Sequence, residues 1–102
     1  MGLVKKTAQA KEDLIDIWLY IARDNPQAAD KMLDRFESHF TKLGNSPKIG
    51  REITGLEHEW LDHDIRFFPV QDYLIIYDTL KNRGVEVVRV IHAALDYTRI
   101  LK

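Results

Sequence analysis

The sequence predicts an α+β domain in which an N-terminal helical hairpin packs on a small antiparallel sheet, in the order β-α-α-β-β-β. Two observations predict this class. Apolar residues recur at intervals of three and four in the first half of the chain, whereas the second half contains short β-rich runs separated by turn residues. No Pro-, Gly- or Ser-rich stretch divides the 102 residues, so we expect one domain over residues 1–102.

Two helices are expected after a short strand at residues 3–7. Residues 11–24 have the apolar spacing of one helix face, at Leu14, Ile17, Trp18 and Ile21. Asn25 is a favourable N-cap and Pro26 suits the first position of a second helix. The spacing then continues to Leu43, and Gly44 is expected to end the helix in a left-handed conformation. So short a connection predicts two antiparallel helices in contact.

Three strands are expected after an irregular or weakly helical region that reaches about Asp64. They cover residues 64–70, 73–80 and 85–93, and the last two flank a four-residue hairpin loop. Strict alternation would place Val85, Val87, Arg89 and Ile91 opposite Glu86, Val88, Val90 and His92. Neither face of these strands is wholly polar. Since two helices cover only one face, we expect the other to be a concave site or an apolar docking surface.

Composition narrows the class of protein. The chain is 45% hydrophobic and 30% charged with a net charge of −1, which is ordinary for a globular domain. It has no cysteine and no apolar run long enough for a membrane span, so we expect a cytoplasmic protein without membrane contact. The histidines at positions 58 and 63 have a spacing unsuited to one helix or strand face. We therefore expect no metal and no cofactor.

Charge is unevenly distributed along the chain. Residues 12–37 are predominantly acidic, whereas residues 79–102 are predominantly basic. A domain that binds nucleic acid mainly by charge is usually basic overall, so direct sequence-specific nucleic-acid binding is not expected. The basic tail suits an acidic protein surface or a phosphate group. On the first helix, Tyr20 points away from the apolar face and is available to a partner.

Short motifs follow one another in a fixed order along nearly the whole chain. In the hairpin they are Ala10, Asp13-Leu14, Ile17-Trp18, Tyr20-Ile21-Ala22, Asn25-Pro26 and Ala28-Ala29. In the second half they are Pro47, Gly50-Arg51, Arg66-Phe67-Phe68-Pro69-Val70, Tyr73-Leu74-Ile75-Ile76-Tyr77 and Arg89-Val90-Ile91-His92. As an ordered set, these motifs resemble the ParE toxins of the ParE/RelE superfamily of bacterial toxin–antitoxin systems, which includes plasmid stabilisation proteins.

The resemblance implies a non-enzymatic toxin that traps the cleaved-DNA complex of DNA gyrase and blocks replication. It also implies a ParD-like antitoxin that wraps an extended and helical segment around the toxin in a hetero-oligomer. The expected contacts to target or antitoxin are Arg66, Tyr73, Arg89, His92, Asp96, Tyr97 and Arg99. One position departs from the family: Leu95 stands where the motif after the histidine usually has arginine, and leucine cannot replace a charge-assisted contact.

Two alternatives remain open from the sequence. The RelE branch of the superfamily cuts messenger RNA on the ribosome, which requires an acid, a base and cations around one phosphate. The residues that could supply them are Arg51, Arg66, Arg89, His92 and Tyr97. The near-neutral net charge argues against this branch, because it gives little attraction for ribosomal RNA. The second alternative is a protein that binds its antitoxin but has lost toxicity.

Several polar residues also have purely structural interpretations. Arg89 is expected to form an ion pair with Asp96 or Asp78 that compensates a partly buried charge. His92 is expected to be a hydrogen-bonded residue of the core.

Arg66 belongs to a strand whose alternate residues are apolar, so we expect it to face the open side of the sheet, where a partner would contact it.

Overall fold

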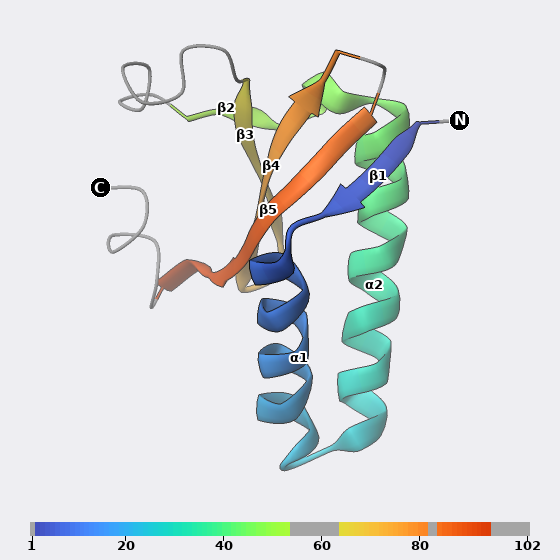
Figure 1. Ribbon diagram of the computed structural model, residues 1–102. Helices are drawn as coiled ribbons and strands as arrows, with labels where there is room; N and C mark the ends of the chain where they lie inside the picture. The colour runs from blue at the N-terminus through green and yellow to red at the C-terminus, as the bar shows by residue number, and fades with distance from the viewer. Residues whose placement is uncertain (1, 54–63, 82–83, 95–102) are drawn as a thin grey trace.

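A computed structural model describes residues 2–53, 64–81 and 84–94 of the chain. In these residues a pair of antiparallel helices packs against one face of a five-stranded sheet (Figure 1). The elements are β1 (Leu3–Lys6), α1 (Ala8–Ala22), α2 (Pro26–Asn45), the 3-10 turn η1 (Pro47–Ile49), β2 (Arg51–Glu52), β3 (Ile65–Val70), β4 (Tyr73–Leu80) and β5 (Gly84–His92). The α+β class and the helical hairpin are therefore confirmed.

The sheet has the strand order β1-β5-β4-β3-β2 and is mixed, not wholly antiparallel as expected. β1 runs parallel to β5, with Leu3 opposite Gly84 and Lys6 opposite Val87. The remaining neighbours are antiparallel, including β2, which pairs with β3 in a region expected to be irregular. A two-residue strand has no recognisable alternation, and the direction of β1 depends on a partner about 80 residues away. Neither feature is encoded locally.

Side-chain caps define the beginning of both helices. Thr7 Oγ1 accepts a hydrogen bond from Ala10 N, and Asn25 Oδ1 accepts one from Ala28 N, as the sequence suggested for Asn25. The prediction that Gly44 ends the second helix is wrong, because α2 continues to Asn45. Gly44 is instead a point of close approach. A Cβ there would lie 2.8 Å from Val4 Cγ2 and 3.3 Å from the carbonyl oxygen of Gly2.

Apolar residues cover both faces of the sheet, as the alternation predicted. The helix-side core joins α2 to the central strands, with Phe36, Phe40, Leu43, Tyr73, Ile75, Tyr77, Val85, Val87 and Val90. The opposite face has a second cluster of Ile65, Leu74, Ile76 and Ile91. These four side chains are only 2–8% exposed, so the expected exposed apolar strip is not found among them. Within the described part of the chain no helix is long and apolar enough to cross a membrane.

A β-bulge in β5 changes which residues face the helices. The register with β4 shifts between Ile76, which is opposite Arg89, and Tyr77, which is opposite Val87. The extra residue breaks the strict alternation expected for this strand. As a result Val90 joins the helix-side core and His92 packs beside Tyr73. The bulge therefore places Val90 and His92 on the helix side of the sheet.

Candidate functional site

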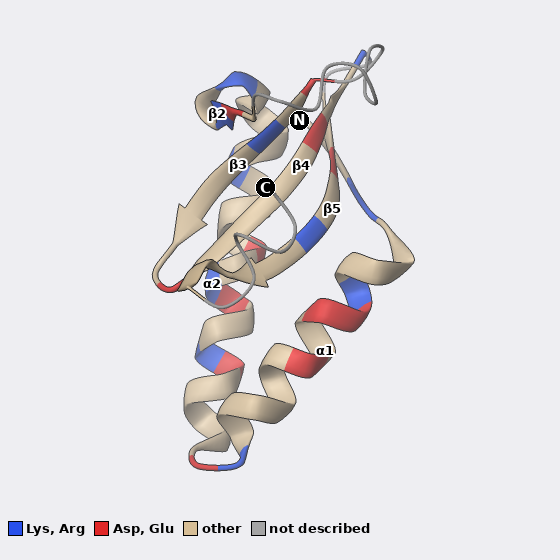
Figure 2. Cartoon of the chain, turned by 90° about the vertical axis from the view of Figure 1, so that its left-hand side faces the viewer, with Lys and Arg blue, Asp and Glu red and all other residues tan. Residues whose placement is uncertain are grey.

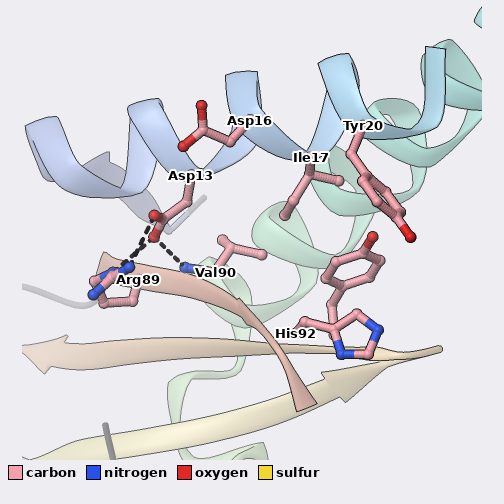
Figure 3. Close-up of a pocket in the computed structure, with 8 residues that line it drawn as sticks. Asp13, Asp16, Ile17, Tyr20, Arg89, Val90 and His92 are labelled. Atoms are coloured by element: carbon pink, nitrogen blue, oxygen red, sulfur yellow. Dashed lines mark hydrogen bonds and ion pairs between the residues drawn. The ribbon is translucent and has the colours of Figure 1, made fainter. Parts of the chain in front are cut away.

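A pocket of about 260 Å³ lies between α1 and the ends of β4 and β5 (Figure 3). Helix α1 contributes Asp13, Asp16, Ile17 and Tyr20, and the strands contribute Tyr73, Arg89, Val90 and His92. Three residues predicted as contacts, Tyr73, Arg89 and His92, are thus brought together. The pocket is the candidate site because it combines charged, aromatic and apolar side chains in one concave surface.

Asp13 joins α1 to β5 at one end of this pocket. Its Oδ2 accepts hydrogen bonds from Arg89 Nε at 2.8 Å and from Val90 N at 3.0 Å (Figure 3). Its Oδ1 accepts from Arg89 Nη2 at 3.1 Å and from Gln9 Nε2 at 3.1 Å. The carboxylate is 7% exposed and the Arg89 side chain 33% exposed. Arg89 is therefore paired with Asp13, a partner that the sequence did not suggest. Asp96, one of the two expected partners, lies outside the described residues.

The edge of β5 explains why an aspartate is needed at this place. β1 pairs with β5 only as far as Val87, so beyond that residue no described strand pairs with the side of β5 that faces away from β4. Thr7 donates its backbone N–H to Val87 O at 3.0 Å and its hydroxyl to Val88 O at 2.8 Å. Asp13 then accepts the N–H of Val90. The beginning of α1 thus replaces the missing strand and fixes the helix against the sheet.

Aromatic side chains form the other end of the pocket. The rings of Tyr73 and His92 are 5.4 Å apart and nearly perpendicular, and Tyr73 also packs edge-on against Phe36 at 5.6 Å. Burial raises the pKa of the Tyr73 hydroxyl, and the nearby Tyr20 and Asp72 raise it further. Tyr73 therefore stays protonated at neutral pH. Tyr20 is 67% exposed and lines the entrance.

Arg66 does not belong to this pocket, and the prediction that it faces the open side of the sheet is wrong. It is opposite Tyr77 in the β3–β4 register, so it shares the face of a helix-side core residue. Its Nη1 donates to the carbonyl oxygens of Gly50 at 2.7 Å and Lys48 at 3.2 Å. The guanidinium also contacts Asp64 and Glu52, and the side chain is 11% exposed. Arg66 thus holds the η1–β2 connection onto the sheet.

Two groups that contact this connection from other parts of the chain have shifted pKa values. The Tyr77 hydroxyl donates to Pro47 O at 2.7 Å and accepts from Gly50 N at 2.9 Å, and burial raises its pKa. Burial also acts to raise the pKa of Asp64, but hydrogen bonds from Lys48, Arg66 and Thr79 outweigh it and lower the pKa. These interactions stabilise the fold and leave little of Arg66 for a ligand.

The remaining predicted residues divide into two groups. Arg51 lies exposed on β2, in the same strand pair as Arg66 and apart from the pocket. Asp96, Tyr97 and Arg99 lie outside the described residues, as does Leu95. Among the described residues no group of three His, Cys, Asp or Glu side chains could hold a metal ion, and positions 58 and 63 are outside them.

Sequence reasoning missed two acidic residues of the pocket, Asp13 and Asp16. Asp13 lies four residues before Ile17, on the helix face that packs against the sheet. An acid on an otherwise apolar face was the available signal that a buried partner exists, because a buried charge is almost always paired. The identity of that partner could not be read from helix periodicity.

The fold of this chain is similar to that of a solved structure. The chain superimposes on a structure described as "Chromosomal ParDE TA system from P. aeruginosa", with a TM-score of 0.66 and 17% sequence identity. The match covers 90% of this chain and 96% of the other. At this identity the similarity establishes a shared fold: a helical hairpin on a mixed sheet. Comparison with curated protein sequences gave no significant match.

The sequence also matches a family model. Residues 4–97 match the model described as ParE toxin of type II toxin-antitoxin system, parDE. That range includes the whole pocket and every element of the fold except Leu3, the first residue of β1. The chain therefore belongs to the ParE toxin family of type II toxin–antitoxin systems.

Proposed function

We propose that this ParE-family protein poisons DNA gyrase, and that a ParD-like antitoxin neutralises it in a hetero-oligomeric complex. Membership of the ParE toxin family supports the toxin class. The observation that favours a binding function over RNA cleavage is the separation of the candidate nuclease residues. Arg66 is committed to the η1–β2 connection, whereas Arg89 is bound by Asp13 in the pocket beside α1.

A ribonuclease of the RelE type needs its acid, base and cations around one phosphate, within hydrogen-bond reach of the reacting atoms. Here Arg66 and Arg89 are neutralised by separate carboxylates, Asp64 and Asp13. His92 is in contact with Tyr73, whose raised pKa keeps it protonated at neutral pH. This arrangement is better suited to contact with a protein surface than to catalysis.

An antitoxin partner is supported by the exposed apolar residues of α1. Ile15 and Leu19 are 58% and 53% exposed and one helical turn apart, next to the exposed Tyr20. Exposed apolar side chains grouped on one helix are typical of a docking surface. The similar P. aeruginosa structure is described as a ParDE system, which is consistent with a ParD-like partner for this chain.

Induced expression tests the proposal. The protein would be produced in a bacterial host alone and together with the neighbouring reading frame, expected to encode a short, partly disordered DNA-binding antitoxin. We expect growth arrest, induction of a DNA-damage reporter, and rescue by the neighbouring protein. With the purified toxin, gyrase should accumulate cleaved-DNA complexes in a supercoiling assay.

Other results would contradict the proposal in distinct ways. Cutting of translated messages without DNA damage would indicate the RelE-type ribonuclease, and a His92→Gln variant would then lose the cutting. Normal growth with folded, soluble protein would indicate a non-toxic antitoxin-binding protein. An Asp34→Asn variant, changed at an exposed position of α2, is a suitable control for expression.

A further inference from the structure

The pocket beside α1 has the chemistry of a cation-binding site. Arg89 would repel a cation, but its charge is matched by two hydrogen bonds to Asp13. Asp16 is a second carboxylate at the pocket, on the exposed side of α1, and within the described residues it has no hydrogen bond or ion pair. Among the described residues, the Asp16 carboxylate is therefore a negative charge of the pocket without a countercharge.

Aromatic rings line the same pocket as that carboxylate. Asp16 and Tyr20 are four residues apart on α1, so their side chains project from the same helix face about 5–6 Å apart at their Cβ atoms. Tyr73 and His92 form the wall opposite Tyr20. A cation over a tyrosine ring is attracted by the ring's negative face, and a nearby carboxylate strengthens the attraction.

Size and surroundings restrict the ligand further. At about 260 Å³ the pocket is smaller than the roughly 300–1,000 Å³ typical of small-molecule sites, and it suits one side chain better than a nucleotide. Residues 12–37 contain seven acids and three bases, and acidic residues appear as red bands along α1 (Figure 2). This charge balance attracts a basic partner.

The helix that lines the pocket also has exposed apolar residues outside it. Ile15 and Leu19 lie beside Asp16 and Tyr20 on α1 and are more than half exposed. A free amine or metabolite would leave them uncovered, whereas a polypeptide along α1 would cover them while placing one side chain in the pocket. Arginine fits better than lysine, because its planar guanidinium can stack on Tyr20 and pair with a carboxylate at the same time.

The geometry points to a receptor site for an arginine side chain of a partner polypeptide that lies along α1, with that side chain in the pocket that Asp16, Tyr20, Tyr73 and His92 line. The inference goes beyond the proposed function and holds whichever protein the toxin acts on. Arg89 is a positioning residue here, because its pairing with Asp13 fixes the end of β5 that presents His92.

An NMR titration of the full chain tests the site. The probes are N-acetyl-arginine methylamide and its uncharged isostere, N-acetyl-citrulline methylamide. We expect saturable shifts at Tyr20, Tyr73 and His92 with the arginine probe and much weaker ones with citrulline. Asp16→Asn should weaken binding of the arginine probe by about three- to fivefold, as expected for one exposed charge pair, whereas Asp34→Asn should not. Equal shifts with both probes, or none with either, would overturn the inference.

A second titration tests whether the ligand is a polypeptide. A helical peptide with leucine four residues from its arginine should bind about tenfold more tightly than the single amino acid, because it also buries Ile15 and Leu19. The paired variant Ile15→Ser, Leu19→Ser should remove that gain and leave binding of the arginine probe unchanged. If the peptide binds no more tightly than the arginine probe, the pocket binds only a guanidinium group, and the inference of a partner polypeptide is refuted. Circular dichroism confirms that each variant is folded.

Discussion

Replacing Asp13 with alanine removes the carboxylate that joins α1 to the edge of β5. The change deletes four hydrogen bonds, from Gln9, Val90 and two nitrogens of Arg89. None of the described strands can take over the N–H of Val90, because β1 pairs with β5 only as far as Val87. The expected result is a substantial loss of stability with little change in helix content.

The magnitude follows from the two kinds of contact. A buried backbone N–H left without a partner costs about 1–3 kcal/mol. The ion pair adds less than a fully buried one, because Arg89 is 33% exposed and solvent screens it, and we take about 1 kcal/mol. Together these give a loss of about 2–4 kcal/mol in the free energy of unfolding, a large fraction of the roughly 5–15 kcal/mol of a typical domain.

Urea unfolding monitored by circular dichroism measures this loss. With a slope of about 1–3 kcal/mol per molar urea for a small protein, the midpoint should fall by about 1–2 M. Arg89→Met should cost only about 1 kcal/mol, because Asp13 still accepts the Val90 N–H in that variant. The exposed Asp16→Asn should change stability by less than about 0.5 kcal/mol.

The relative losses of unfolding free energy in these variants show whether the Val90 N–H contact or the ion pair contributes more. If Asp13→Ala costs less than about 1 kcal/mol, the carboxylate does not complete the strand edge. If Arg89→Met costs as much as Asp13→Ala, the ion pair and not the backbone contact is the main contribution. Either result would refute the reasoning.

Three further predictions concern the η1–β2 connection. Tyr77→Phe should lower the free energy of unfolding by about 1–3 kcal/mol in urea denaturation, because Pro47 O and Gly50 N lose their partner; no change would mean that water replaces the hydroxyl. Gly50→Ala should cost more than Tyr77→Phe in the same assay, since the new Cβ would lie 2.2 Å from the Tyr77 hydroxyl oxygen. Asp64 has a lowered folded-state pKa, so it contributes stability above its ordinary value of 3.8 that is lost as the pH falls through the folded value. The stability difference between the wild type and Asp64→Asn should therefore shrink on acidification below that value, and a difference independent of pH would contradict the assigned pKa shift.

Much of the fold could be predicted because its signals are local. The apolar spacing of α1 and α2, the cap at Asn25 and the alternation of β4 each depend on residues only a few positions apart. The prediction for Gly44 was wrong for an instructive reason. Glycine is needed there for the close approach of Gly2 and Val4, and this requirement comes from packing and not from a left-handed turn.

The candidate site was predicted less completely. Tyr73, Arg89 and His92 were identified, but Arg66 was assigned to the wrong face, and the role of Asp13 was not recognised. Alternation along a strand indicates which residues share a face, but it does not indicate where a neighbouring loop folds over that face. The carbonyl oxygens of Lys48 and Gly50 bind Arg66 because the chain passes over it, 16–18 residues away in sequence.

The sequence by itself determined the class of this protein: two amphipathic helices, a β-rich second half with apolar residues on both faces, and an ordered set of motifs that matches the ParE toxin family. Only the tertiary structure decided the direction of β1, the bulge in β5 and the pairing of Asp13 with Arg89 across 76 residues. The physical reason is that unpaired backbone groups at the edge of β5 must be satisfied. Which residue satisfies them depends on which element the fold places beside that edge.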